Sequence, residues 1–115
     1  MRRGDVVWVD LHPVRRHEAN KVRPAVIVSN DGANRRATDL GRGTVTVVPI
    51  TSNTARVHPF QVELPKGSCG LSRESKAQAE QVRAVSVSRV GRVAGHLPPE
   101  LLDQLDDALR LHLQA

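Results

Sequence analysis

The sequence is poor in cysteine and in long apolar runs. Its 115 residues include one cysteine, Cys69, so no disulfide can form within the chain. No apolar run approaches the roughly 20 residues of a membrane span, and no signal-peptide core follows the N-terminal charges. The sequence therefore predicts a single domain, residues 1–115, that works in the cytoplasm and away from membranes.

Aromatic residues and cofactor motifs are equally scarce. Trp8 and Phe60 are the only aromatic residues. We expect at least one of them in the core, which disfavours the base-stacking platforms of RNA-recognition sheets. There is no nucleotide-binding glycine loop, paired CxxC or HExxH motif, so kinase, dehydrogenase and zinc-site functions have no support. The five histidines lie far apart in the sequence, and we predict neither a metal nor a cofactor.

What the chain has in excess is arginine. Residues 1–96 hold 16 of the 17 Lys and Arg against 8 acids, whereas residues 97–115 hold one Arg against 4 acids. Fourteen of the 17 cations are Arg, whose planar guanidinium binds phosphate through two parallel N–H groups. The sequence therefore predicts a polyanionic partner for residues 1–96.

Most of the chain follows the pattern of short strands. Alternation, β-branched residues and flanking prolines predict strands over 4–11, 24–29, 44–51 and 60–64. In the first of these, Val7, Val9 and Leu11 share one face and Val6 and Trp8 share the other. Residues 30–35 favour at most a short helical turn, and residues 66–75 a loop. Residues 77–87 are ambiguous, because 78–81 contain helix formers, and we predict a strand.

The C-terminal segment predicts one amphipathic helix. Pro98 and Pro99 suit its first turn, and leucines then recur at helical spacing while acidic residues line the opposite face. The fold class is therefore mostly β (α+β), a small barrel with short helices and this C-terminal helix packed against it.

Two polar strand ends suggest phosphate chemistry. Arg23 stands where a buried strand begins, and the 44–51 strand ends in Thr51, Ser52 and Asn53, which could face Arg23 across a sheet. RNA cleavage by the neighbouring ribose 2′-OH needs a base, an acid and donors for the growing phosphate charge. Arg23 and Thr51 can supply the donors. The alternatives are an arginine paired with a surface acid and a threonine that caps a turn.

Proton transfer has three candidates. His17 and Glu18 are nearest in sequence to Arg23, and His17 has an ordinary pKa near neutrality. Glu80 could act as a base or could orient Arg23 or Arg83. Each of the three could instead belong to a solvated loop or a surface ion pair.

The chain resembles the MazF/PemK/Kid family of toxin endoribonucleases of type II toxin-antitoxin pairs. The resemblance rests on ordered segments: residues 3–8, 10–13, 17–18, 23–30, 48–52 and 80–83, followed by the Leu-rich helix. It implies an SH3-like β-barrel, a homodimer and a groove at the dimer interface for single-stranded RNA. It also implies direct action of Arg23 and Thr51 on the scissile phosphate, with roles for His17, Glu18 and Glu80.

The resemblance further implies a sequence-specific, metal-independent endoribonuclease that is inhibited by a cognate acidic antitoxin. A family arginine falls at Gln78, which carries no charge. The positions predicted to contact the RNA strand are Lys21, Ser52, Asn53, Lys76, Gln78 and Arg83. The rival interpretations are a CcdB-like toxin that binds gyrase and a non-catalytic SH3-like nucleic-acid-binding module, the latter favoured if Arg23 and Thr51 lie far apart.

Overall fold

The computed structural model describes residues 1–11 and 22–115. The described strands are β1 (Asp5–Asp10), β2 (Val22–Ile27), β3 (Thr44–Thr51), β4 (Gln61–Leu64), β5 (Ser75–Gln78), β6 (Arg83–Ser86) and β7 (Val90–His96). The helices are α1 (Asp31–Leu40), α2 (Pro99–Leu113) and the short 3₁₀ turns η1 (Ala79–Gln81) and η2 (Val87–Arg89). None of the helices in these two described ranges has the length and apolar character needed to cross a membrane.

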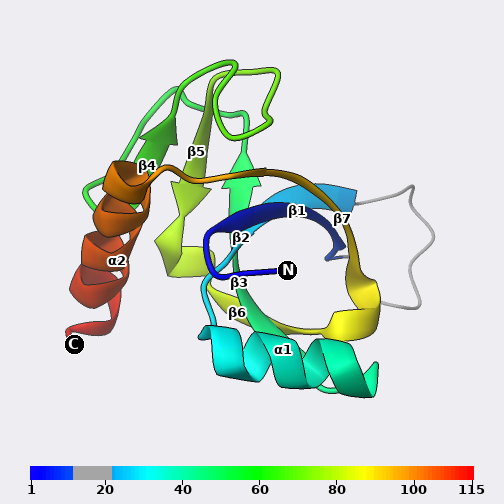
Figure 1. Cartoon of the computed structure of the whole chain (residues 1–115). Coiled ribbons are helices and arrows are strands. Elements are labelled where there is room, and N and C mark those ends of the chain that lie inside the picture. Colours follow the sequence, from blue (N-terminus) through cyan, green and yellow to red (C-terminus); the bar gives the residue numbers. More distant parts are fainter. Residues whose placement is uncertain (12–21) are drawn as a thin grey trace.

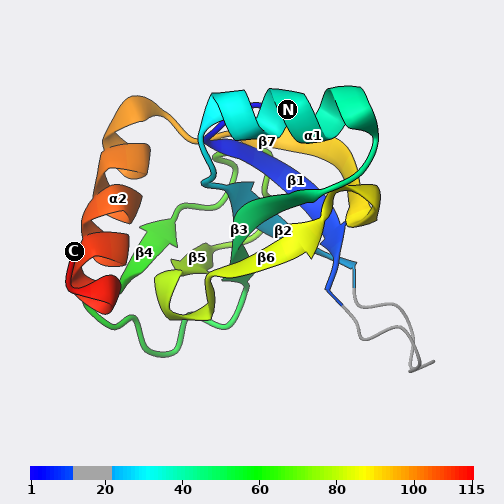
Figure 2. The same ribbon diagram turned by 90° about the horizontal axis from the view of Figure 1, so that it is seen from below.

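The strands form one strongly curled antiparallel sheet (Figures 1 and 2) in the order β4-β5-β3-β2-β1-β7, with β6 also beside β3. One edge of β3 pairs with β2. Its other edge pairs with two strands in turn, Thr44–Val47 with β6 and Ile50–Thr51 with β5. Within the described residues no ladder joins β6 or β4 to β7. The mostly β fold class is thus confirmed, and the predicted barrel is an open one rather than a closed one.

The two faces of the sheet bury two separate apolar clusters, as the alternation in the first strand predicts. Val6 belongs to the cluster beneath α2, which also contains Leu105 from that helix. Val7 and Val9 belong to the cluster on the α1 side, which includes Ala37. The helices therefore lie where each face of the sheet needs apolar cover, with α2 beside β4 and α1 across the opposite end in Figure 1.

The prediction of at most a helical turn over 30–35 is wrong, because α1 runs for ten residues. Asn30 caps the helix by accepting the Ala33 N–H at 2.8 Å, and Gly41 ends it with φ 66°. Asn34 is fully buried and donates to the Ser29 carbonyl at 2.8 Å. That contact ties the helix to the end of β2, and neither periodicity nor propensity reveals it.

The strand predicted over 77–87 is two strands, because η1 separates β5 from β6. The edge strand β7 was not anticipated at all. It is rich in glycine and arginine and mostly exposed, and Val93 on it is 49% exposed. Such an edge strand lacks the apolar alternation by which strands are recognised.

Arg3 connects the N-terminus to both helices. Its backbone N–H donates to Asp31 Oδ1 at 2.7 Å, which lowers the pKa of that carboxyl. Its guanidinium donates to the Val28 carbonyl at 3.2 Å and also bonds Asp106 of α2. These contacts hold the acidic C-terminal helix against the basic remainder of the chain.

Candidate functional site

A cleft opens where β2 and β3 stop pairing. The ladder between them ends at Ala25 and Pro49, and the preceding residue on β2 is Pro24. Neither proline has an N–H to donate, which favours the end of pairing at this point. The cleft has a volume of about 230 Å³, and its lining residues are Trp8, Val22, Arg23, Pro24, Ile50, Ser52, Gly70, Leu71, Ser72, Arg73 and Ser75.

Arg23 lies near the start of β2, and Thr51 is the last residue of the neighbouring strand β3. The pairs Ile27–Val47, Val26–Val48 and Ala25–Pro49 set an antiparallel register, and its continuation places Arg23 opposite Thr51. Arg23 is exposed and lines the cleft, whereas Thr51 is half-buried and is not a lining residue, although its neighbours Ile50 and Ser52 are. The Thr51 hydroxyl oxygen accepts the Asn53 N–H at 3.2 Å, which leaves the hydroxyl proton for another acceptor.

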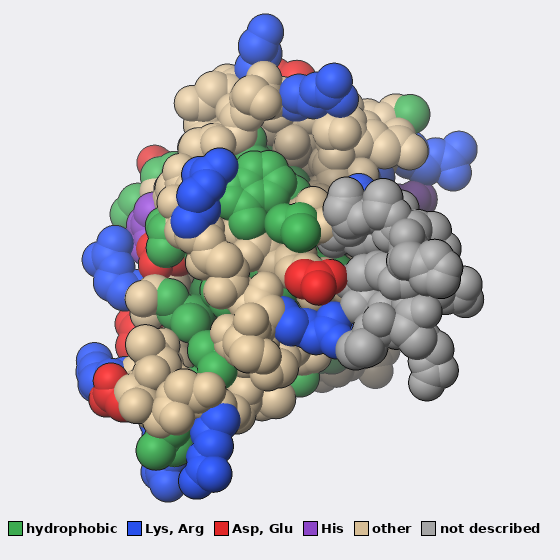
Figure 3. All heavy atoms as spheres, turned by 90° about the vertical axis from the view of Figure 1, so that its right-hand side faces the viewer, with side chains coloured by type: hydrophobic (Ala, Val, Ile, Leu, Met, Phe, Trp, Pro, Cys, Tyr) green, Lys and Arg blue, Asp and Glu red, His purple; other side chains and the backbone are tan. Residues whose placement is uncertain are grey.

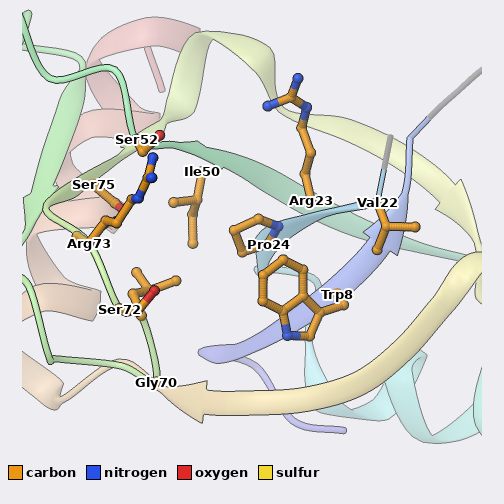
Figure 4. A pocket seen from close by; sticks show the side chains of 11 residues that line it. Trp8, Val22, Arg23, Pro24, Ile50, Ser52, Gly70, Ser72, Arg73 and Ser75 are labelled. Carbon is orange, nitrogen blue, oxygen red and sulfur yellow. The ribbon is translucent and has the colours of Figure 1, made fainter. Parts of the chain in front are cut away.

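The wall opposite Arg23 carries a second arginine, Arg73, together with Ser72 (Figure 4). The Arg73 carbonyl accepts a hydrogen bond from the Ser75 hydroxyl at 2.9 Å, which fixes the backbone there. In Figure 4 the Arg73 side chain extends toward Ser52, and the Arg23 side chain extends away from Trp8 and Pro24. No carboxylate is among the described lining residues, so the cleft attracts anions.

The floor of the cleft contains Trp8, which pairs directly with Pro24 across β1 and β2. Arg92 lies over the Trp8 ring, with Cζ 5.7 Å from the ring centroid. Trp8 Nε1 is buried and has no hydrogen-bond partner among the described residues. Figure 3 views the molecule from the side on which β2 begins and shows hydrophobic side chains there between Lys and Arg side chains.

The prediction that at least one aromatic residue belongs to the core is wrong. Trp8 and Phe60 are both only partly buried. Phe60 stacks on His58 with ring centroids 5.1 Å apart, whereas Trp8 lines the cleft. The aliphatic side chains of the two clusters fill the core without them.

The remaining positions predicted to contact RNA are dispersed. Ser52 and Asn53 are exposed directly after Thr51. Gln78 is half-buried and pairs with Gln61 across β4 and β5. Arg83 is exposed and donates to the Leu11 carbonyl at 3.5 Å.

Lys76 and Glu80 face the protein more than the solvent. Lys76 is 8% exposed, and its ammonium donates to the Arg56 carbonyl at 2.5 Å, which argues against the predicted contact with an RNA backbone. Glu80 Oε2 accepts from Gln61 Nε2 at 2.8 Å, and its other carboxylate oxygen is buried with no partner among the described residues. Glu80 therefore does not orient Arg23 or Arg83 through an ion pair within the described residues.

The predicted residues His17, Glu18 and Lys21 lie outside the described residues. Within the described ranges no group of three or more His, Cys, Asp or Glu side chains is arranged to hold a metal ion.

Sequence reasoning missed Trp8, Pro24 and Arg73 as members of the site. The adjacency of Trp8 and Pro24 depends on strand register. Arg73 lies in a segment that sequence reasoning assigned to a loop without a role. The only sequence feature that could have indicated a role for Arg73 is the number of small polar residues around it in that loop.

The fold and the cleft define a small, mostly β protein with an arginine-lined groove at the ends of two strands. The family model of PemK-like, MazF-like toxins of type II toxin-antitoxin systems matches residues 2–113. The chain therefore belongs to this toxin family, and the family prediction made from the sequence is confirmed.

Individual relatives agree over nearly the whole chain. Endoribonuclease MazF9 of Mycobacterium tuberculosis is 56% identical over 113 residues, which are 98% of this chain and 96% of that protein. Endoribonuclease EndoA of Bacillus subtilis is 33% identical over 114 residues, covering 98% and 94% of the two chains.

Solved structures show the same fold. A mycobacterial endoribonuclease in complex with its cognate antitoxin superposes with a TM-score of 0.78 at 24% identity, covering 99% of this chain and 95% of that one. A MazE–MazF structure from Deinococcus radiodurans gives a TM-score of 0.78 at 26% identity, with coverage of 99% and 96%. The α+β, mostly β class therefore agrees with known toxins of this family.

Proposed function

We propose that this chain, an endoribonuclease of the PemK/MazF toxin family, cuts single-stranded RNA at a short sequence motif and without a metal ion. The ribose 2′-OH attacks the adjacent phosphorus, the P–O5′ bond breaks, and the products carry a 2′,3′-cyclic phosphate and a 5′-OH. The proton of the 2′-OH goes to a base, and the departing 5′-oxygen receives a proton from an acid. The observation that supports the proposal is the β2–β3 register, which ends at Ala25 and Pro49 and whose continuation would bring Arg23 opposite Thr51.

Arg23 and Thr51 act on the phosphate itself. The guanidinium of Arg23 has no carboxylate partner among the described residues, so its N–H groups are available to the two non-bridging oxygens. The Thr51 hydroxyl proton reaches the same phosphate from the neighbouring strand. Both interactions strengthen as negative charge accumulates in the transition state, which is the condition for catalysis.

The candidates for proton transfer are His17, Glu18 and Glu80. Glu80 is the described member of this set, and one oxygen of its carboxylate is buried without a hydrogen-bond partner among the described residues. A pH profile of the cleavage rate separates the candidates: loss of the acidic limb in Glu80→Gln identifies Glu80 as the base, and an unchanged limb excludes it.

The partners follow from the charge distribution. We propose that an acidic antitoxin binds the basic body of the chain and blocks the cleft, as an antitoxin accompanies two of the structural relatives. Antitoxin binding that does not weaken with added salt would contradict this.

We also propose a homodimer, because Val93, Leu111 and Leu113 expose large apolar surfaces, each about half exposed or more. Light scattering at the mass of one chain would exclude it.

The test is cleavage of a labelled single-stranded RNA in EDTA, followed by analysis of both new ends. Arg23→Ala is expected to lower the rate on the order of 100-fold or more, by analogy with lost oxyanion donors. Thr51→Val keeps the branched shape without the hydroxyl and should also lower the rate. Arg42→Ala is the matched control, because Arg42 is exposed at the far end of α1 and lies outside the cleft.

Three results would overturn the proposal. Activity that requires a divalent cation removes the metal-independent mechanism, and full activity in folded Arg23→Ala removes the assigned role. Binding of gyrase without any RNA cleavage favours the CcdB-like interpretation, and RNA binding without cleavage favours a non-catalytic module.

A further inference from the structure

Apolar side chains from three adjacent strands line the cleft. Trp8 and Pro24 are direct partners across β1 and β2, and the β2–β3 register continues to Ile50 opposite Pro24. Figure 4 shows the Trp8 and Pro24 rings close together with Ile50 across the opening. An indole beside a pyrrolidine ring and an isoleucine suits the flat face of a nucleobase.

The rim of the same cleft carries cations and hydroxyls. Arg23 and Arg73 stand on opposite walls, and within the described residues neither guanidinium pairs with a carboxylate. Ser52 and Ser72 add hydroxyl groups beside Arg73. Unpaired guanidinium groups above an apolar floor match the two parts of a nucleotide, the phosphate and the base.

The size of the cleft limits its occupant. About 230 Å³ is smaller than the roughly 300–1,000 Å³ of a typical small-molecule pocket. The space therefore suits one nucleotide of a longer strand, whose backbone enters and leaves along the rim.

We propose that this cleft binds a single nucleotide adjacent to the scissile phosphate, with its base against Trp8 and Pro24 and its phosphate held by Arg73. The inference rests on the proposed function, because the strand that occupies the cleft is the RNA substrate. Trp8 and Arg73 act here as binding residues that hold the strand while Arg23 acts on the reacting phosphate. Stacking on Trp8 tolerates any base, so the cleft supplies affinity more than sequence choice.

Trp8 offers a direct test because it is the only tryptophan in the chain. The probe is the oligoribonucleotide that the wild-type protein cuts most rapidly, carrying 2′-O-methyl groups so that it cannot be cleaved. We expect saturable quenching of Trp8 fluorescence as this probe binds. Arg73→Gln should weaken binding about fivefold or more, whereas Arg42→Gln, outside the cleft, should leave it unchanged.

Steady-state cleavage supplies the second readout. Trp8→Leu should raise KM by about 5- to 150-fold, the range found when stacking aromatics are removed, with little change in kcat. Trp8→Phe keeps an aromatic face and should restore most of the affinity by fluorescence anisotropy. A KM in Trp8→Leu equal to that of the wild type would overturn the inference, as would a fall in kcat alone in that variant.

The outcomes separate this inference from the proposed function. RNA that is bound and cut without any change in Trp8 emission overturns the nucleotide site and leaves the nuclease in place. Quenching by an acidic antitoxin peptide but not by RNA assigns the cleft to the antitoxin and also overturns the inference. If no RNA is cut at all, the proposed function itself fails first.

Discussion

Substituting Gly95 with alanine should damage both the stability of the protein and the cleft. Gly95 lies on β7 directly against the turn at Cys69 and Gly70. A Cβ at Gly95 would lie 2.4 Å from both the carbonyl carbon and oxygen of Cys69 and 2.8 Å from the Gly70 nitrogen. Ordinary contacts between such atoms are about 3.5–4.0 Å, so the turn must move away from β7 by about 1 Å.

The size of the effect follows from which atoms collide. All three are backbone atoms, which cannot avoid the new methyl group by changing rotamer. The approach is equally close from the other side, because a Cβ at Gly70 would lie 2.0 Å from the Ala94 oxygen. We therefore expect a loss near the upper end of the overpacking range, about 3 kcal/mol of unfolding free energy.

Gly67→Ala provides the matched control in the same loop. Gly67 has φ +83°, but no atom lies within 4 Å of its Cβ position. Its substitution should cost only the left-handed backbone strain, about 1 kcal/mol. Urea denaturation monitored by circular dichroism measures both variants, and equal losses in the two would refute the contact argument. Because the turn leads into Ser72 and Arg73, Gly95→Ala should also raise KM for RNA, whereas Gly67→Ala should not.

Two further perturbations test the core and the N-terminal contacts. Leu105→Ala empties a fully buried position between α2 and the sheet and should lower the unfolding free energy by about 2–5 kcal/mol, measured by urea denaturation; a loss below 1 kcal/mol would show that the site collapses. The pKa of Asp31 is lowered in the folded state, so its contribution to stability is complete above the ordinary aspartate pKa of about 3.9 and is lost as the pH falls through the lower folded value. Asp31→Asn should therefore flatten the fall in stability below about pH 4, and an unchanged acid profile would contradict the role of the Arg3 N–H.

Much of the sheet could be predicted because local pattern and tertiary burial agree there. The strand over Thr44–Thr51 is described with the predicted bounds, and the split of Val6 from Val7 and Val9 between two faces follows directly from alternation. The sequence underestimates α1 because a glycine follows its capping residues, whereas the buried side chain of Asn34 ties the helix to Ser29 through a contact between elements. The periodicity of a sequence predicts helices and strands, but it does not predict polar contacts between them.

The candidate site likewise contains residues that the sequence could predict and residues that it could not. The prediction that Arg23 and Thr51 act together follows from the sequence, because Arg23 precedes one recognisable strand and Thr51 ends another, and the structure pairs these two strands. Arg73 could not be predicted, because its position depends on a turn held against β7 by the contact between Gly70 and Gly95. Short-range pattern contains no information about a contact between segments 25 residues apart in sequence.

The unpaired arginines of the cleft bear on both partners proposed for this chain, an RNA strand and an acidic antitoxin. Elsewhere Arg3 pairs with Asp106 and Arg110 pairs with Asp107, whereas the cleft holds Arg23 and Arg73 without a carboxylate among the described residues. The positive charge of the cleft favours the binding of a polyanion, and a polyanion that binds only the folded state stabilises the fold. If both proposed partners bind at this cleft, an RNA strand and an acidic antitoxin segment compete for the same positive charge, and we expect an excess of the antitoxin segment to inhibit cleavage.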